Sequence, residues 1–262
     1  MTVHTVHASR RTAVSRLRAL LPISEFDRAA QPPLRAELFL IAHDDLTGLL
    51  HLSKKQLEKG LAAAILLELW LAEHIAIGWR YDARYGPWQP DPGRITILTD
   101  TLTGDPLLDS ALALLQRMNT PRIRDFIRAF TQTGNLYERV RGDMTATGLL
   151  QTKLRRRLFT RREVYTATDL EFPVRARAKI RHLITQPGLI ARRDEPEQYV
   201  PALAGLVTAL GLTRNLSSSE ISAGTLHTEL NNLIDALPDP TIRDVGTAMF
   251  PSRRPHTATT RN

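Results

Sequence analysis

The sequence predicts a mainly α-helical fold, a helical core that carries two β-hairpins and contains winged-helix-like elements. Apolar residues recur at helical spacing along most of the chain, while two segments alternate polar and apolar residues instead. The 262 residues, of which 42% are apolar, suffice for one large folded domain. We expect a basic flexible arm over 1–32, an α-rich domain over 33–250 and a polar tail over 251–262.

The first helices are expected between residues 34 and 72. Apolar residues repeat at helical spacing from Leu34, and the turn His43-Asp44-Asp45 ends this helix. Ser53 and Gln56 then form a capping box, because their side chains can satisfy free backbone N–H groups at a helix start. The helix that follows is apolar nearly all round, which predicts a place in the middle of a bundle.

A first hairpin is expected over 75–99, with a long Pro- and Gly-rich loop over 81–93. Asp105-Pro106 then supplies an N-cap and a proline at the first helical position, and Thr120-Pro121 repeats this pattern for the next helix. The buried stripe of that second helix is predicted to contain Ile123, Phe126, Ile127 and Phe130. Further helices are predicted over 135–147, 173–184, 196–212, 221–237 and 241–250.

A second hairpin is expected between residues 149 and 169, and its tip is strongly basic. Five arginines frame an apolar pair: Arg155, Arg156, Arg157, Leu158, Phe159, Arg161 and Arg162. Arginine suits phosphate because its planar group donates two parallel hydrogen bonds, and an apolar pair at a ribbon tip can enter the headgroup layer of a bilayer. The opposing interpretation is a solvated ribbon end whose charges prevent strand-to-strand aggregation.

Composition narrows the function classes further. The 35 Lys and Arg exceed the 27 Asp and Glu by 8, and this excess favours polyanionic partners. The absence of cysteine rules out disulfides, thiolate nucleophiles and iron–sulfur clusters, and fits a reducing compartment. No apolar run is long enough to span a bilayer. The early arginines are followed by acidic residues, which favours a mobile arm over a transit peptide.

Enzyme signatures are absent from the sequence, which lacks the phosphate-loop, dinucleotide-binding and hydrolase motifs. His43-Asp44 suggests a divalent metal, and a metal-dependent hydrolase is one alternative, but these residue types are also typical of a turn. Glu68, inside an apolar helix, could carry a raised pKa, although pairing with an arginine or a backbone N–H is the commoner arrangement. We predict no enzyme activity, no cofactor and no metal.

A winged-helix nucleic-acid-binding regulator is the main alternative function. Its wing would be 155–162, and its recognition helix the preceding segment 135–147. That helix offers Arg139 and Arg141 but also Glu138 and Asp143, a mixed face that is poor for groove binding. We therefore regard nucleic acid as the less favoured partner.

The sequence resembles the Golgi phosphoprotein 3 family, which has bacterial relatives, over about 34 to 245. The resemblance is carried by four segments in order: LRAELFLIAHDDLTG at 34–48, GLAAAILLEL at 60–69, TGDPLLDSAL at 103–112, and GLL at 148–150 with the hairpin after it. It implies a mostly helical, non-enzymatic adaptor that binds phosphatidylinositol 4-phosphate at a membrane. It also implies that the hairpin serves membrane contact and homo-oligomerisation.

The resemblance also locates the family's lipid pocket on this chain. Its tryptophan and first arginine correspond to Ser53 and Ala62, and its two arginines before the hairpin to Gly134 and Tyr137, or, after a shift, one of them to Arg141. A looser headgroup site is expected instead, with five candidate residues: Lys54, Lys55, Lys59, Arg139 and Arg141. We thus predict a cytoplasmic protein, peripheral at the membrane surface, whose partners are anionic lipids.

Overall fold

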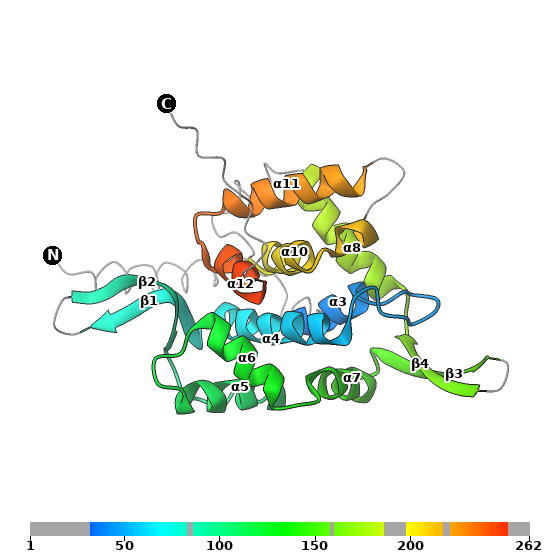
Figure 1. Ribbon diagram of the computed structural model, residues 1–262, viewed down its shortest axis with the longest axis horizontal. Coiled ribbons are helices and arrows are strands. Elements are labelled where there is room, and N and C mark those ends of the chain that lie inside the picture. The colour runs from blue at the N-terminus through cyan, green and yellow to red at the C-terminus, as the bar shows by residue number, and fades with distance from the viewer. Residues whose placement is uncertain (1–31, 83–85, 158–159, 186–197, 217–220, 251–262) are drawn as a thin grey trace, which may run out of the picture.

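The structure is a computed structural model that describes residues 32–82, 86–157, 160–185, 198–216 and 221–250. Figure 1 shows layered helices from which two β-ribbons extend at opposite ends. The predicted class, mainly helical with two hairpins, is confirmed. Most of the arm, the apolar pair at 158–159 and the tail lie outside the described residues.

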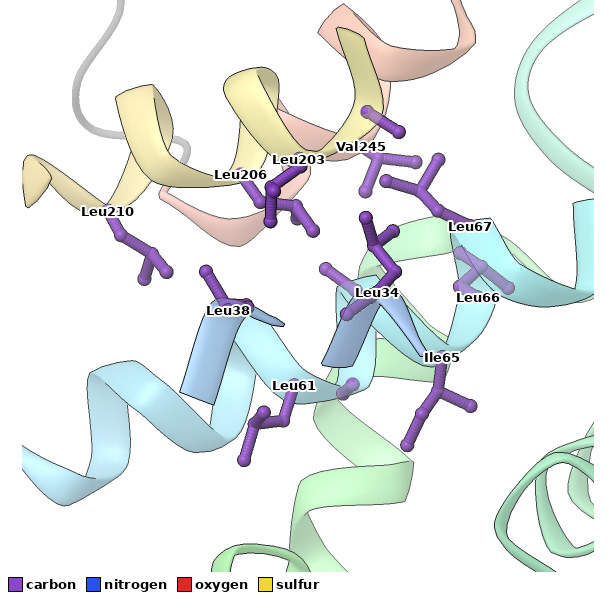
Figure 2. Close-up of a cluster of buried hydrophobic side chains, with 14 of the residues drawn as sticks. Leu34, Leu38, Leu61, Ile65, Leu66, Leu67, Leu203, Leu206, Leu210 and Val245 are labelled. Atoms are coloured by element: carbon purple, nitrogen blue, oxygen red, sulfur yellow. The ribbon is translucent and has the colours of Figure 1, made fainter. Parts of the chain in front are cut away.

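The core is built around α4 (Lys54–Leu71), which crosses the middle of the molecule between α3 (Leu34–Ile41), α10 (Tyr199–Leu210) and the helices below it (Figure 1). The predicted capping box at Ser53 and Gln56 is present, and α4 is buried along most of its length, as its sequence predicts. Figure 2 shows leucine side chains from α3, α4 and α10 meeting at the centre of this cluster.

Two glycines allow the central helices to pack closely. A Cβ atom at Gly60 of α4 would lie 2.7 Å from a methyl group of Leu210 in α10. A Cβ atom at Gly205 of α10 would overlap Ile242 of α12 (Thr241–Met249). Because glycine has no side chain, α10 can lie close to both α4 and α12. The two glycines therefore set the spacing between these helices.

Three short helices form the lower layer in Figure 1: α5 (Pro106–Arg117), α6 (Ile123–Gln132) and α7 (Leu136–Ala146). The predicted cap of α5 is confirmed, because Asp105 accepts hydrogen bonds from the backbone N–H groups of the first turn. The apolar stripe predicted for α6 is buried. The predicted cap at Thr120 is wrong: Thr120 has a φ of 51°, and the carbonyl of Pro121 accepts the N–H of Ile95 at 2.9 Å, so α6 begins two residues later.

The first hairpin differs from its prediction in length. Strands β1 (Ile75–Asp82) and β2 (Gly86–Ile97) extend through most of the segment expected to be a long loop. The pairing reaches Asp82 and Gly86, with irregularities after Ile77 and Arg80. Prolines are tolerated because each strand of a two-stranded ribbon has an open edge where no N–H is needed.

The second hairpin lies at the other end of the molecule, where β3 (Leu150–Arg157) pairs with β4 (Thr160–Ala167). The hairpin itself is confirmed, but its strands are longer than predicted, because the arginines expected at its tip are paired within them. It leads into α8 (Glu171–Thr185), and later into α11 (Ala223–Asp235) and α12. The helix expected over 196–212 is shorter, because Gly211, with a φ of 75°, ends α10 before the 3-10 helix η1 (Leu212–Leu216). In the described segments no helix combines the length and apolar character needed to cross a bilayer.

Candidate functional site

The β3–β4 ribbon projects beyond the helical body (Figure 1). Its register places Arg155 opposite Arg162 and Arg156 opposite Arg161. Residues directly opposite each other in an antiparallel pair share a face of the ribbon, and like charges at such positions destabilise it. The register therefore sets basic residues opposite each other along the outer part of the ribbon, and the acidic Glu163 of β4 is paired with Leu154. The predicted inserting pair, Leu158 and Phe159, lies outside the described residues.

A cluster of aromatic and charged side chains lies at the base of the ribbon, where α4, α7 and β4 meet. The Arg141 guanidinium is 4.1 Å from the ring centre of Tyr165, and Lys54 Nζ is 5.1 Å from that of Tyr137. Both cations also contact Glu138, Lys54 at 3.0 Å and Arg141 at 2.6 Å. We call these five residues the basal cluster. Two cations share one carboxylate, which leaves a net positive charge there.

The buried His43 side chain is hydrogen-bonded to the Tyr137 side chain of the basal cluster. Its Nδ1 lies 2.7 Å from the carbonyl oxygen of Phe39, and its Nε2 lies 3.1 Å from the hydroxyl of Tyr137. Because a carbonyl only accepts, Nδ1 carries the proton in the neutral ring and Nε2 accepts from Tyr137. Burial lowers the pKa of His43 to about 4, with the Phe39 carbonyl opposing the shift.

The turn at 43–48 has a structural explanation. Both ring nitrogens of His43 are engaged in hydrogen bonds, and Asp44 accepts hydrogen bonds from the backbone N–H of Leu46 and from Thr47. Hydrogen bonds from Thr47, first the hydroxyl and then the backbone N–H, hold the pKa of Asp44 below its usual value. Among the described residues no group of three or more metal-ligating side chains gathers. These contacts match the turn interpretation of His43-Asp44.

The other predicted headgroup residues do not join the basal cluster. Arg139 turns to α5 and donates to the hydroxyl of Ser110 at 2.9 Å. Lys59 lies on another side of α4, with its ammonium 5.3 Å from the ring centre of Phe250. Lys55 is exposed on the first turn of α4. The structure thus brings two of the five candidates, Lys54 and Arg141, to one place.

Glu68 is a structural carboxylate. It accepts the backbone N–H of Arg35 at 2.7 Å and pairs with the Arg35 guanidinium, which also pairs with Asp105 and lies 3.4 Å from Asp143. Burial raises the pKa of Glu68, and the nearby guanidinium opposes this effect. Both arrangements expected for this residue, an arginine partner and a backbone N–H, are therefore present.

A group of exposed apolar side chains that was not predicted from the sequence lies beside the ribbon. Leu46 and Leu49 in the loop after α3 are 79% and 54% exposed, and Leu170 and Val174 at the start of α8 are 49% and 50% exposed. Two observations show that this loop packs against α8 and β4. Arg177 of α8 donates to Asp45 through its two terminal guanidinium nitrogens at 2.6 and 2.7 Å. The backbone at Gly48 lies so close to β4 that a Cβ atom there would be 2.6 Å from the carbonyl oxygen of Tyr165.

We call Leu46, Leu49, Leu170 and Val174 the apolar rim. The sequence does contain a sign of the loop part of this rim. Leu46 and Leu49 flank a tight Thr-Gly turn, a place where polar residues are usual. Exposed leucine by itself is common on protein surfaces, and here the neighbouring cationic ribbon makes the group informative.

The fold and these features define a class: a helical domain with an arginine ribbon, a basal cluster of cations and exposed apolar residues at one end. A protein-family model described as Golgi phosphoprotein 3 (GPP34) matches residues 34–249. The chain belongs to this family, as the sequence motifs indicated. A search of curated proteins finds no match to the chain.

Proposed function

We propose that this protein is a non-enzymatic adaptor that binds acidic phospholipid headgroups at a membrane surface. One observation carries the proposal: the arginine ribbon and the apolar rim lie together at one end of the molecule, next to the basal cluster. Membership of the Golgi phosphoprotein 3 family supports it, because the resemblance implies a phosphoinositide-binding adaptor.

The magnitudes favour reversible docking. A basic residue near an anionic leaflet contributes about 1 kcal/mol, and full burial of a leucine side chain contributes about 1.5–3 kcal/mol. A few arginines of the ribbon together with Leu46 would therefore hold the protein at a bilayer. The attraction is screened by salt over about 8 Å at physiological ionic strength. Binding should thus require anionic lipid and decline as salt rises.

The basal cluster is the proposed headgroup contact. Arg141 and Lys54 rest on tyrosine rings and share Glu138, so a phosphate can replace part of that shared carboxylate contact. The positions that correspond to the family pocket hold Ser53, Ala62 and Gly134 here. We therefore propose recognition of anionic headgroups as a class, with phosphatidylinositol 4-phosphate as one member.

Vesicle co-sedimentation tests the proposal. Wild-type protein should bind vesicles that contain phosphatidylserine or phosphatidylinositol 4-phosphate and be released by salt. The double variant Arg156→Gln/Arg161→Gln should lose about tenfold or more in partitioning, since two cations near the surface are removed. The matched control Arg117→Gln/Arg243→Gln removes the same charge from exposed helix positions elsewhere and should bind nearly as wild type.

A second variant tests the apolar rim. Leu46→Ser/Leu49→Ser should weaken binding to the same vesicles while its salt dependence stays unchanged, because no charge is altered. Equal binding of wild type to neutral and anionic vesicles would contradict the electrostatic part. A steep, salt-dependent affinity for duplex DNA with sequence preference, and none for vesicles, would favour the winged-helix alternative instead.

A further inference from the structure

A second cationic site lies away from the ribbon, where α4, α6 and α12 meet. Figure 1 shows α12 and α6 on either side of α4. A cavity of about 380 Å³ opens at this junction. The described residues that line it are Lys59, Arg124, Ile127, Arg128, Thr131, Gln132, Ala248, Met249 and Phe250. This volume is in the range of small-ligand sites.

The cavity has a cationic rim and an apolar floor. Lys59, Arg124 and Arg128 are exposed at its edge, whereas Ile127 and Met249 are buried beneath them. None of the described lining residues is acidic. Among the described residues, Asp125 on the exposed face of α6 brings a carboxylate to within 3.9 Å of Arg128.

The three cations gather like charges at the edge of the cavity. Arg124 and Arg128 are four residues apart on α6, a spacing that brings like charges together on a helix face. Lys59 faces them from α4, its ammonium held over the Phe250 ring at 5.3 Å. Guanidinium groups bind phosphate through paired hydrogen bonds, and an ammonium adds a compact charge.

The two ends of the chain do not complement the charge of this cavity's rim. The tail at 251–262 follows Phe250 directly and contains three arginines and no acidic residue. The arm at 1–31 contains five arginines and two acidic residues. Both segments carry the same sign of charge as the rim, so the complementary occupant is an anion from outside the chain.

We propose that this cavity binds a phosphate ester, with the phosphate between Lys59, Arg124 and Arg128 and the organic part over Ile127, Met249 and Phe250. The phosphate could belong to a soluble ester or to a lipid headgroup, which share this chemistry. The site does not depend on the ribbon and is separate from the basal cluster.

Isothermal titration calorimetry on the full chain at low salt tests the site, with phenyl phosphate, inorganic phosphate and phenol as probes. Phenyl phosphate should bind more tightly than inorganic phosphate, because it also covers the apolar floor, and phenol should not bind measurably. Arg124→Gln/Arg128→Gln should weaken phenyl phosphate binding by about tenfold to a hundredfold, since charge-assisted hydrogen bonds are lost. Both positions are exposed, and circular dichroism would verify that the variant folds.

Two comparisons make the test decisive. The control Arg117→Gln/Arg243→Gln has the same net charge as Arg124→Gln/Arg128→Gln and should keep the binding of phenyl phosphate, as should the ribbon variant Arg156→Gln/Arg161→Gln. The proposal is overturned if wild type binds no phosphate ester, if the cavity variant binds as wild type, or if the control loses as much. Inorganic phosphate binding as tightly as phenyl phosphate would overturn the assignment of the apolar floor.

Vesicles that contain phosphatidic acid separate the two sources of phosphate. The comparison is made in the ribbon variant Arg156→Gln/Arg161→Gln, in which binding through the ribbon is weakened. If adding Arg124→Gln/Arg128→Gln abolishes both phenyl phosphate binding and the remaining vesicle binding, the ligand is a lipid headgroup; if it abolishes phenyl phosphate binding and leaves the remaining vesicle binding unchanged, the ligand is a soluble ester. Both outcomes support the cavity as an anion site. Failure of vesicle binding in the ribbon variant alone concerns the proposed membrane function and leaves the cavity unaffected.

Discussion

Arginine occurs in two opposite settings in this molecule. Arg35 is 2% exposed and faces three carboxylates from three other elements: Glu68 of α4, Asp105 at the cap of α5 and Asp143 of α7. In the β3–β4 ribbon, the register sets arginine opposite arginine. The first arrangement neutralises the cation within the fold, and the second pairs like charges in register, which we propose an external anion offsets. The comparison separates a structural arginine from arginines that we propose to serve binding.

The largest expected effect is the removal of the buried cation. Arg35→Met leaves Glu68 buried without its partner, which costs about 3–5 kcal/mol of the free energy of unfolding. Urea denaturation followed by circular dichroism measures this loss. The double variant Arg35→Met/Glu68→Leu should recover a large part of it, because the stranded charge is removed as well. A single variant as stable as wild type would show that Arg35 does not serve the fold as argued.

An intermediate effect is expected from the buried histidine under the basal cluster. The pKa of His43 is about 4 when folded, against an ordinary value of 6.5. The unfolded chain therefore binds a proton at this residue between pH 6.5 and 4 and the folded chain does not. Stability contributed by the neutral ring is full above pH 6.5 and is lost as the pH falls to 4, about 3 kcal/mol in all.

The measurement for His43 is the difference between wild type and His43→Gln in urea unfolding at several pH values. The variant should lose less stability than wild type from pH 6.5 to 4, because it cannot take up this proton. Carboxylates that titrate in the same range act in both proteins and cancel in the difference. Parallel pH profiles would mean that His43 is protonated alike in both states, contrary to its burial.

The elements of the fold were largely predictable, because they rest on local signals. Helical spacing, the Ser53 capping box and the Asp105 cap lie within a few residues of the helices they specify. The errors came from tertiary contacts. Thr120 does not cap α6 because Pro121 is held by Ile95, and β2 continues through prolines because its partner strand accommodates them with irregular pairing.

The site was less predictable than the fold. Sequence spacing could not show that Lys54 and Arg141, 87 positions apart, meet at Tyr137 while Lys59 faces a different helix. Nor could it identify Arg35 as the partner of Glu68, since that pairing depends on how α3 crosses α4. The ribbon was predictable because its two strands are adjacent in the sequence, so the hairpin depends on local residues. The rest of the site depends on contacts between residues that are far apart in the sequence.

The smallest expected effect has the opposite sign to the first. Arg156→Gln/Arg161→Gln removes one like-charge pair from directly opposed positions, and such pairs cost about 0.2–1 kcal/mol. The variant should therefore unfold at the same or slightly higher urea concentration than wild type, although its vesicle binding falls. A loss of stability as large as that expected for Arg35→Met would place these arginines in the fold. If the variant keeps its stability but binds vesicles more weakly, these arginines serve binding to an external anion. The same positive charge then destabilises the ribbon slightly and attracts the anionic partner.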